Sequence, residues 1–160
     1  VRDMLPKIIR YWGAIGGVCD GTGIGEPLAY HLKELFDRNN DGLVEAYKFK
    51  AAGDESKSKL GYLAYDFNHN DLIKVPKAPE DPDQLELWKE LRWQVEHLTR
   101  EAKRQQTINF YVPANAEPRK PGHVPHDDLV MALFLLMRAA RNIDPNTGKA
   151  TAFDREKSGV

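Results

Sequence analysis

The sequence lacks the features that mark secreted and membrane proteins. It has one cysteine in 160 residues, Cys19, so no disulfide can form within the chain. A single cysteine in an apolar run fits a reducing compartment and is interpreted as a small buried side chain. The longest apolar run, Leu129–Met137, is far shorter than the ~20 residues of a membrane-spanning helix, and no signal peptide is recognisable. We therefore expect a cytoplasmic protein.

The sequence also lacks a charge excess of either sign. Its 23 Lys and Arg residues are balanced by 24 Asp and Glu residues, which gives a formal net charge of −1. A strongly basic chain would indicate a nucleic-acid partner through its overall field, so any such contact here must come from local patches. No Walker motif is present, which excludes an ATPase motor, and no serine or cysteine has a triad-like setting.

The apolar pattern predicts helices that alternate with strands. Helices are predicted over Met4–Trp12, from Glu26 with a core face ending at Phe36, over Lys57–Phe67, from Pro82 with an apolar stripe ending at Ala102, and over Leu129–Ala140. Strands are predicted over Ile15–Cys19, Leu43–Phe49, Leu72–Val75 and Thr107–Val112. Turns are predicted over Gly21–Gly25 and Asn39–Gly42. This order predicts an α/β layer fold with a largely parallel sheet, placed in residues 1–142. Residues 143–160 are polar and are expected to form a flexible tail.

The first residue that could carry chemistry is Asp20. It stands at the end of a predicted strand and directly before the glycine loop Gly21–Gly25. Active sites of open α/β sheets lie beyond such strand ends, and glycines allow a phosphate or a backbone to approach closely. Two other interpretations stay open, a purely structural turn and a generic nucleotide loop. The loop is neither a P-loop nor a full G-x-G-x-x-G, because Glu26 occupies the sixth position.

A second candidate is the pair Asp127 and Asp128, which opens the last predicted helix. Acidic residues at a helix start are stabilised by the helix dipole and often act only as caps. Two adjacent carboxylates are more than a cap needs, and the helix that follows is apolar nearly all round. Carboxylate oxygens suit Mg²⁺ or Mn²⁺, so the pair is a candidate metal site.

Four segments in their order resemble one known family. They are Val18–Leu28, the helix Lys57–Leu63, the strand Leu72–Pro76 and the segment Pro125–Leu133. The specific parts are Asp-x-Thr-Gly-x-Gly in the first segment and His-Asp-Asp-Leu-Val-x-Ala-Leu in the last. Together they resemble the nuclease domain of large terminase subunits of tailed phages, over roughly residues 10–141. The resemblance implies an RNase H-like fold, with a mixed sheet flanked by helices.

The resemblance also implies a metal-dependent DNA endonuclease. In that family, acidic residues from separate elements hold two divalent metal ions, which activate a water and stabilise the leaving oxygen of a phosphodiester. Carried over by motif, Asp20 is the strand ligand, and Asp127 and Asp128 are the helix ligands. The family's first Asp lies on an upstream hairpin, and Asp3 is in the wrong context to replace it. We therefore expect that this hairpin is missing and that the chain cuts DNA poorly or not at all.

The same resemblance implies partners and a location. The substrate would be concatemeric double-stranded DNA, cut during genome packaging in the cytoplasm of a bacterial host. The partners would be the terminase ATPase domain, the small terminase subunit and the portal. Two alternatives stay open. One is another RNase H-like nuclease, such as a junction resolvase, and the other is a catalytically inactive remnant that binds DNA or the portal.

Three weaker signals each have an ordinary structural interpretation as well. Arg119 and Lys120, and also His126, stand ahead of the acidic pair and are candidate DNA contacts, although an ordinary solvated loop explains them as well. Asp37–Gly42 begins like an EF-hand loop, but the twelfth position is Lys48 where a Glu is needed. His126-Asp127 invites a comparison with HD phosphohydrolases, which the predicted strands disfavour.

Overall fold

The computed structural model describes residues 4–37, 44–50, 56–74, 77–103, 107–141 and 143. It divides the chain into two compact units, Val1–Lys50 with Leu135–Val160 as unit 1 and Ala51–Phe134 as unit 2. The predicted turn over Asn39–Gly42 and the predicted flexible tail from Asp144 lie outside the described residues. Within the described ranges, no helix is long and apolar enough to cross a membrane. The single domain expected over residues 1–142 stays a prediction.

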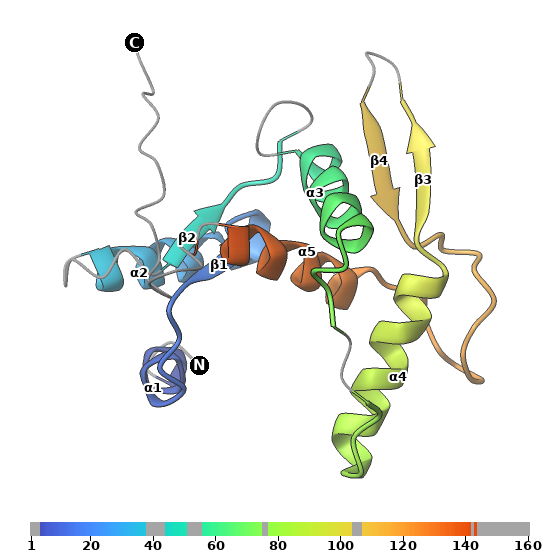
Figure 1. The fold of residues 1–160 in the computed structure, drawn as a ribbon, viewed down its shortest axis with the longest axis horizontal. Coiled ribbons are helices and arrows are strands. Elements are labelled where there is room, and N and C mark those ends of the chain that lie inside the picture. The colour runs from blue at the N-terminus through green and yellow to red at the C-terminus, as the bar shows by residue number, and fades with distance from the viewer. Residues whose placement is uncertain are drawn as a thin grey trace. The chain divides into compact units, whose positions relative to one another are not determined.

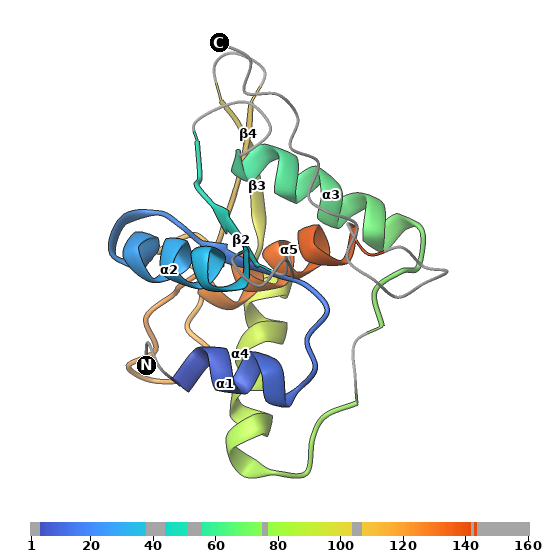
Figure 2. The ribbon, with the colours of Figure 1, turned by 90° about the vertical axis from the view of Figure 1, so that its left-hand side faces the viewer.

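Unit 1 is built around a pair of parallel strands. Strand β1 (Gly17–Asp20) pairs with β2 (Val44–Tyr47) in a register that sets Gly17 opposite Val44 and Asp20 opposite Tyr47. Helix α2 (Glu26–Asp37) connects the two strands and packs against them (Figures 1 and 2). A strand, a helix and a parallel strand are the unit from which α/β sheets are built, so the coarse α/β prediction is confirmed here.

The core of unit 1 lies between α2, β2 and helix α1 (Met4–Tyr11). Leu32 and Phe36, one turn apart on α2, are almost fully buried with Val44. The partly buried side chains packed against them are Leu5, Ile9, Cys19 and Leu28. Arg10 lies over the ring of Phe36, with its guanidinium carbon 5.5 Å from the ring centroid. The 3.6-residue period of the apolar positions therefore identified the packed face of α2, whereas on α1 only Leu5 and Ile9 are packed and Ile8 is exposed.

Helix α5 (Asp128–Arg141) contributes to both units, with its residues up to Phe134 in unit 2 and the rest in unit 1. In unit 1 its Arg138 forms a bidentate ion pair with Glu45 of β2, at 2.8 Å for Nη2 to Oε1 and 3.0 Å for Nε to Oε2. The same guanidinium lies 4.9 Å from the ring centroid of the fully buried Tyr47. Two planar contacts at once fix the guanidinium firmly against β2.

Unit 2 contains helices α3 (Lys57–His69) and α4 (Pro82–Glu96) and an antiparallel hairpin of β3 (Thr99–Ala102) and β4 (Ile108–Tyr111). Each helix starts with a side-chain cap: Ser56 Oγ accepts from the Lys59 N–H, and Asp81 Oδ1 accepts from the Gln84 N–H. Helix α3 packs on β4 (Figure 1), where Gly61 lies against the Phe110 ring.

The prediction of one largely parallel sheet is wrong for the described strands. They form two separate two-stranded sheets, one parallel and one antiparallel. The predicted stripe ending at Ala102 is also wrong, because α4 ends at Glu96 and Thr99–Ala102 is strand β3. All four side chains of β3 are exposed, so no apolar alternation marks this strand, which is held by its ladder with β4.

The strand predicted over Leu72–Val75 is absent from its described part. Leu72–Lys74 joins no ladder, and Leu72 lies in the turn that follows the last residue of α3, His69. The Leu72 N–H donates to the Phe67 carbonyl, the Asp71 N–H donates to the Asn68 carbonyl, and Asp71 has a φ of 54°. These two bonds and one left-handed residue form the Schellman ending of a helix. Val75 and Pro76 lie outside the described residues.

Candidate functional site

Asp20 ends β1, with an exposed side chain at the carboxyl end of the parallel pair. Its Oδ1 accepts a hydrogen bond of 2.8 Å from the Thr22 N–H, so one oxygen of the carboxylate holds the turn. The described residues offer no partner to the other oxygen. A structural turn therefore explains one carboxylate oxygen of Asp20. The other oxygen is available to a ligand.

The glycine loop after Asp20 is tightly packed against β2. The Gly21 N–H donates to the Tyr47 carbonyl at 2.7 Å, which extends the ladder by one residue. A Cβ at Gly25 would lie 2.9 Å from the Asp20 carbonyl oxygen, and Gly23 has a φ of 60°. Thr22 Oγ1 accepts from the Phe49 N–H, which ties the loop to the segment after β2. These contacts hold Asp20 in place on a rigid backbone.

The acidic pair stands at the start of α5 in unit 2. Asp127 directly precedes the helix, and its carbonyl accepts the first helical hydrogen bond, from the Met131 N–H at 2.9 Å. Asp127 is therefore in the position from which a side chain normally caps a helix. The side chain of Asp128 is exposed and has no partner among the described residues.

The helix is capped by a different residue. Gln94 of α4 is only 2% exposed, and its Oε1 accepts from both the Leu129 N–H and the Val130 N–H, each at 3.0 Å. These are the two amides that a capping aspartate at position 127 would bind. The cap interpretation, which stayed open for the acidic pair, is thus contradicted for Asp127, because another side chain does that work.

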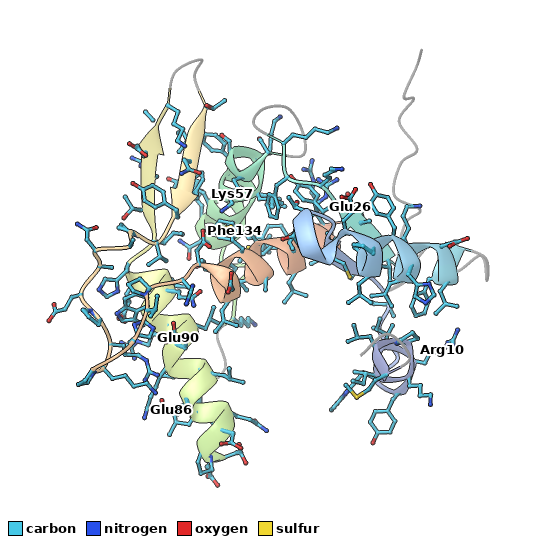
Figure 3. The ribbon with its side chains drawn as sticks, turned by 180° about the vertical axis from the view of Figure 1, so that it is seen from behind. Arg10, Glu26, Lys57, Glu86, Glu90 and Phe134 are labelled. Atoms are coloured by element: carbon cyan, nitrogen blue, oxygen red, sulfur yellow. The ribbon has the colours of Figure 1, made fainter. Side chains whose placement is uncertain are left out.

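The carboxylate of Asp127 instead faces a cation. Its Oδ2 forms an ion pair with Lys57 Nζ at 3.1 Å, between side chains that are 26% and 36% exposed respectively. Lys57 is the first residue of α3 (Figure 3). Sequence reasoning missed this role for Lys57, since the two residues are seventy positions apart and no local pattern connects them.

A second charged cluster lies beside Gln94, around Glu90 of α4. Glu90 accepts hydrogen bonds from Gln94 Nε2 at 3.1 Å, from His123 Nε2 at 3.0 Å and from Arg119 Nε at 3.3 Å. Burial raises the pKa of Glu90, and the hydrogen bonds from Gln94 and His123 outweigh it, so the pKa is lowered overall. Glu90 therefore stays an anion that holds the loop before α5 on α4.

Glu86, one turn before Glu90 on the same helix (Figure 3), extends this cluster. Hydrogen bonds from Arg119 and Lys89 lower its pKa to about 2. Arg119 binds both carboxylates and is 18% exposed, and Lys120 lies 3.5 Å from Glu86. These ion pairs give both basic residues a structural role, while their predicted contact with DNA stays a prediction. His126 is exposed, and its contact with DNA is likewise still a prediction.

The three predicted metal ligands fall into two groups. Asp127 and Asp128 are neighbours in unit 2, whereas Asp20 lies in unit 1. In the described part of the chain, no group of three or more His, Cys, Asp or Glu side chains is arranged to hold a metal ion. The convergence of Asp20 with the acidic pair therefore stays a prediction.

The donor atoms fit a hard divalent cation in kind. Each half of the predicted site offers carboxylate oxygens that neither a cap nor an aspartate turn uses up, which are the oxygens that Mg²⁺ and Mn²⁺ prefer. Asp127 already attracts one positive group, the Lys57 ammonium. Comparison with known protein families, with curated proteins and with solved structures gives no match to this chain.

Proposed function

We propose that the chain is the metal-dependent nuclease domain of a terminase, with an RNase H-like fold, and that it cuts double-stranded DNA. The observation that carries the proposal is the cap of α5. Because Gln94 satisfies the helix start, Asp127 and Asp128 are not needed for capping. Two neighbouring carboxylates that the cap does not use offer the oxygen ligands that a divalent cation prefers.

The position of Asp20 supports the same proposal. It ends a strand of a parallel pair, its backbone is fixed by the glycine loop, and half of its carboxylate has no partner among the described residues. A functional group held on a strand end is better oriented than one on a free loop. In this proposal Asp20, Asp127 and Asp128 are the ligands of Mg²⁺ or Mn²⁺, and the metal supplies an activated water and charge neutralisation at the phosphodiester.

The proposal includes the partners that the terminase resemblance implies. These are concatemeric viral DNA, the terminase ATPase domain, the small subunit and the portal, in the cytoplasm of a bacterial host. Arg119 and Lys120 would contact DNA phosphates more weakly than free cations do, because Glu86 neutralises part of their positive charge. Another RNase H-like nuclease, such as a junction resolvase, would share the metal site and differ in its DNA substrate.

The test is cleavage of supercoiled and linear DNA across a Mn²⁺ titration. We expect at most slow cleavage, which depends on the metal and disappears with a chelator. Asp20→Asn and Asp127→Asn should each lower the cleavage rate about 100-fold or more, because an amide keeps the shape of the side chain and removes its charge. The control is Asp66→Asn, an exposed position on α3, which should leave cleavage unchanged.

Two results would contradict the proposal. One is cleavage by Asp20→Asn at the wild-type rate, which would remove Asp20 from the chemistry. The other is a wild-type protein that neither cuts DNA nor binds Mn²⁺. A four-way junction offered beside linear duplex separates the two nuclease assignments, since a resolvase cuts the junction preferentially.

One observation favours a second candidate function, a binding module without catalysis. The Lys57 ammonium already neutralises Asp127 at 3.1 Å, so this carboxylate is satisfied without a metal. A binding module would retain DNA in an electrophoretic shift with a chelator present and would not cut it at any Mn²⁺ concentration. A nuclease would need the metal for cleavage.

A further inference from the structure

We propose that Gln94 is a positioning residue of the acidic pair, which takes over the capping of α5 and thereby releases the carboxylate of Asp127. Asp127 occupies the usual capping position, and aspartate is among the best capping residues. Its Oδ2 nevertheless points to Lys57 and not to the amides of its own helix. The reason is that both of those amides already donate to Gln94 Oε1.

The orientation of the Gln94 amide is fixed from both ends. The backbone N–H groups of Leu129 and Val130 can only donate, so they require the oxygen of the amide. The Glu90 carboxylate can only accept, so it requires the nitrogen. A flipped amide would set donor against donor and acceptor against acceptor at the same time. The cap is therefore held in one state.

Glu90 is fixed in turn by two side chains from the loop that leads to α5. Arg119 Nε and His123 Nε2 both bind it, and the His123 side chain is 9% exposed, with its ring edge-to-face against Trp93 at 4.5 Å. The hydrogen bonds thus run from the loop through Glu90 and Gln94 to the first turn of α5. The loop that carries the acidic pair and the helix that follows it are fastened to the same face of α4.

Loss of Gln94 should change what Asp127 does. With both amides unpaired, the Asp127 carboxylate would turn from Lys57 to cap its own helix, as aspartate does at this position elsewhere. The fold would be retained, and the carboxylate would no longer be available to bind a cation. The inference rests on the proposed function only in the last step, where the released carboxylate binds a metal.

The first experiment is a double-mutant cycle of Gln94→Leu and Asp127→Ala, read by urea unfolding without any metal. In wild-type protein, Asp127→Ala should change the unfolding constant little, because it removes only a partly exposed ion pair. In the Gln94→Leu background it should raise the unfolding constant about fivefold more, because it then removes the only cap. Equal effects in both backgrounds would overturn the inference.

Amide exchange of the single variant Asp127→Ala gives an independent answer if Gln94→Leu fails to fold. Protection of the Leu129 and Val130 amides should be unchanged, since their acceptor is on Gln94. A marked loss of their protection would show that Asp127 is the cap and would refute the inference.

Binding of Mn²⁺ alone, followed by electron paramagnetic resonance, tests the last step. Gln94→Leu should weaken binding about tenfold, and Gln84→Leu, the same change at an exposed position on α4, should not. If wild-type protein binds no Mn²⁺, the proposed function fails while the cycle still decides the cap. If Gln94→Leu binds Mn²⁺ as wild type does, the positioning role fails and the nuclease proposal stands.

Discussion

Replacement of Gly61 by alanine is the sharpest test of how unit 2 is packed. Gly61 is a buried residue in the middle of α3, facing the ring of Phe110 on β4. A Cβ added there would overlap three atoms of that ring, Cε2, Cδ2 and Cζ. The ring is held by edge-to-face contacts with Tyr62 at 6.3 Å and with Phe134 at 6.2 Å between centroids. It cannot move away without weakening both contacts.

The expected change in stability is the sum of opposing terms. Alanine is preferred over glycine inside a helix by about 1 kcal/mol, which favours the variant. Overpacking a core typically costs about 1–3 kcal/mol, and the disturbed aromatic pairs add about 1 kcal/mol. The net effect is a loss of about 2 kcal/mol, or a melting temperature roughly 4–8 °C lower for a chain of this size.

Thermal unfolding followed by circular dichroism measures this loss, and a second background supplies the control. In Phe110→Leu protein the ring is gone, so Gly61→Ala should become neutral or slightly stabilising. A Gly61→Ala variant as stable as wild type, with Phe110 in place, would refute the packing of α3 on β4 described above.

Two further predictions concern ionisable groups. The pKa of Glu90 is lower in the folded protein than its ordinary value of 4.5, so its contribution to stability is complete above about pH 4.5 and is lost as the pH falls through the folded pKa. Glu90→Gln, which cannot titrate, should therefore lose stability less steeply than wild type between about pH 5 and pH 3 in urea titrations; parallel slopes would contradict this. Burial raises the pKa of the Cys19 thiol, so iodoacetamide at about pH 8 should alkylate folded protein at least about tenfold more slowly than urea-unfolded protein, and equal rates would count against its packing.

The sequence predicted elements well wherever apolar side chains decide the packing. The core face of α2 follows from Leu32 and Phe36 at helical spacing, and α5 follows from the apolar run after Asp128. The short strand before Asp20 was also predicted, because Val18 and Cys19 lie between glycines and a carboxylate. For the two helices, a buried face supplies the signal.

Elements stabilised by polar contacts were not predictable in this way. Strand β3 has four exposed side chains, and its only support is the backbone ladder with β4. On α4, Val95 is apolar and lies within the predicted stripe but is 47% exposed, whereas the residues buried there are Trp93 and Gln94. A hydropathy pattern assigns Gln94 to the surface, because the partners that make its burial possible lie on other elements.

The candidate site shows the same division. The residue types and their order indicated Asp20, Asp127 and Asp128, but no sequence pattern connects Asp127 with Lys57 or Gln94 with the start of α5. Those pairings depend on distant segments meeting in the folded chain, at separations of 70 and 36 residues. They determine which of the predicted roles a carboxylate is able to play.

The anchors of α5 also determine when this helix can find its place as the chain folds. Its partners Gln94 and Glu45 come earlier in the sequence, as does Lys57, the partner of Asp127 just before the helix, and the Glu45–Arg138 pair spans 93 residues. Unit 1 is discontinuous in sequence, and the residues of unit 2, Ala51–Phe134, separate β2 from Arg138 along the chain. Closing so long a loop is slow compared with forming a local helix or hairpin. During synthesis, Glu45 of β2 therefore has no ion-pair partner in Arg138 until the 93 residues after it have been made.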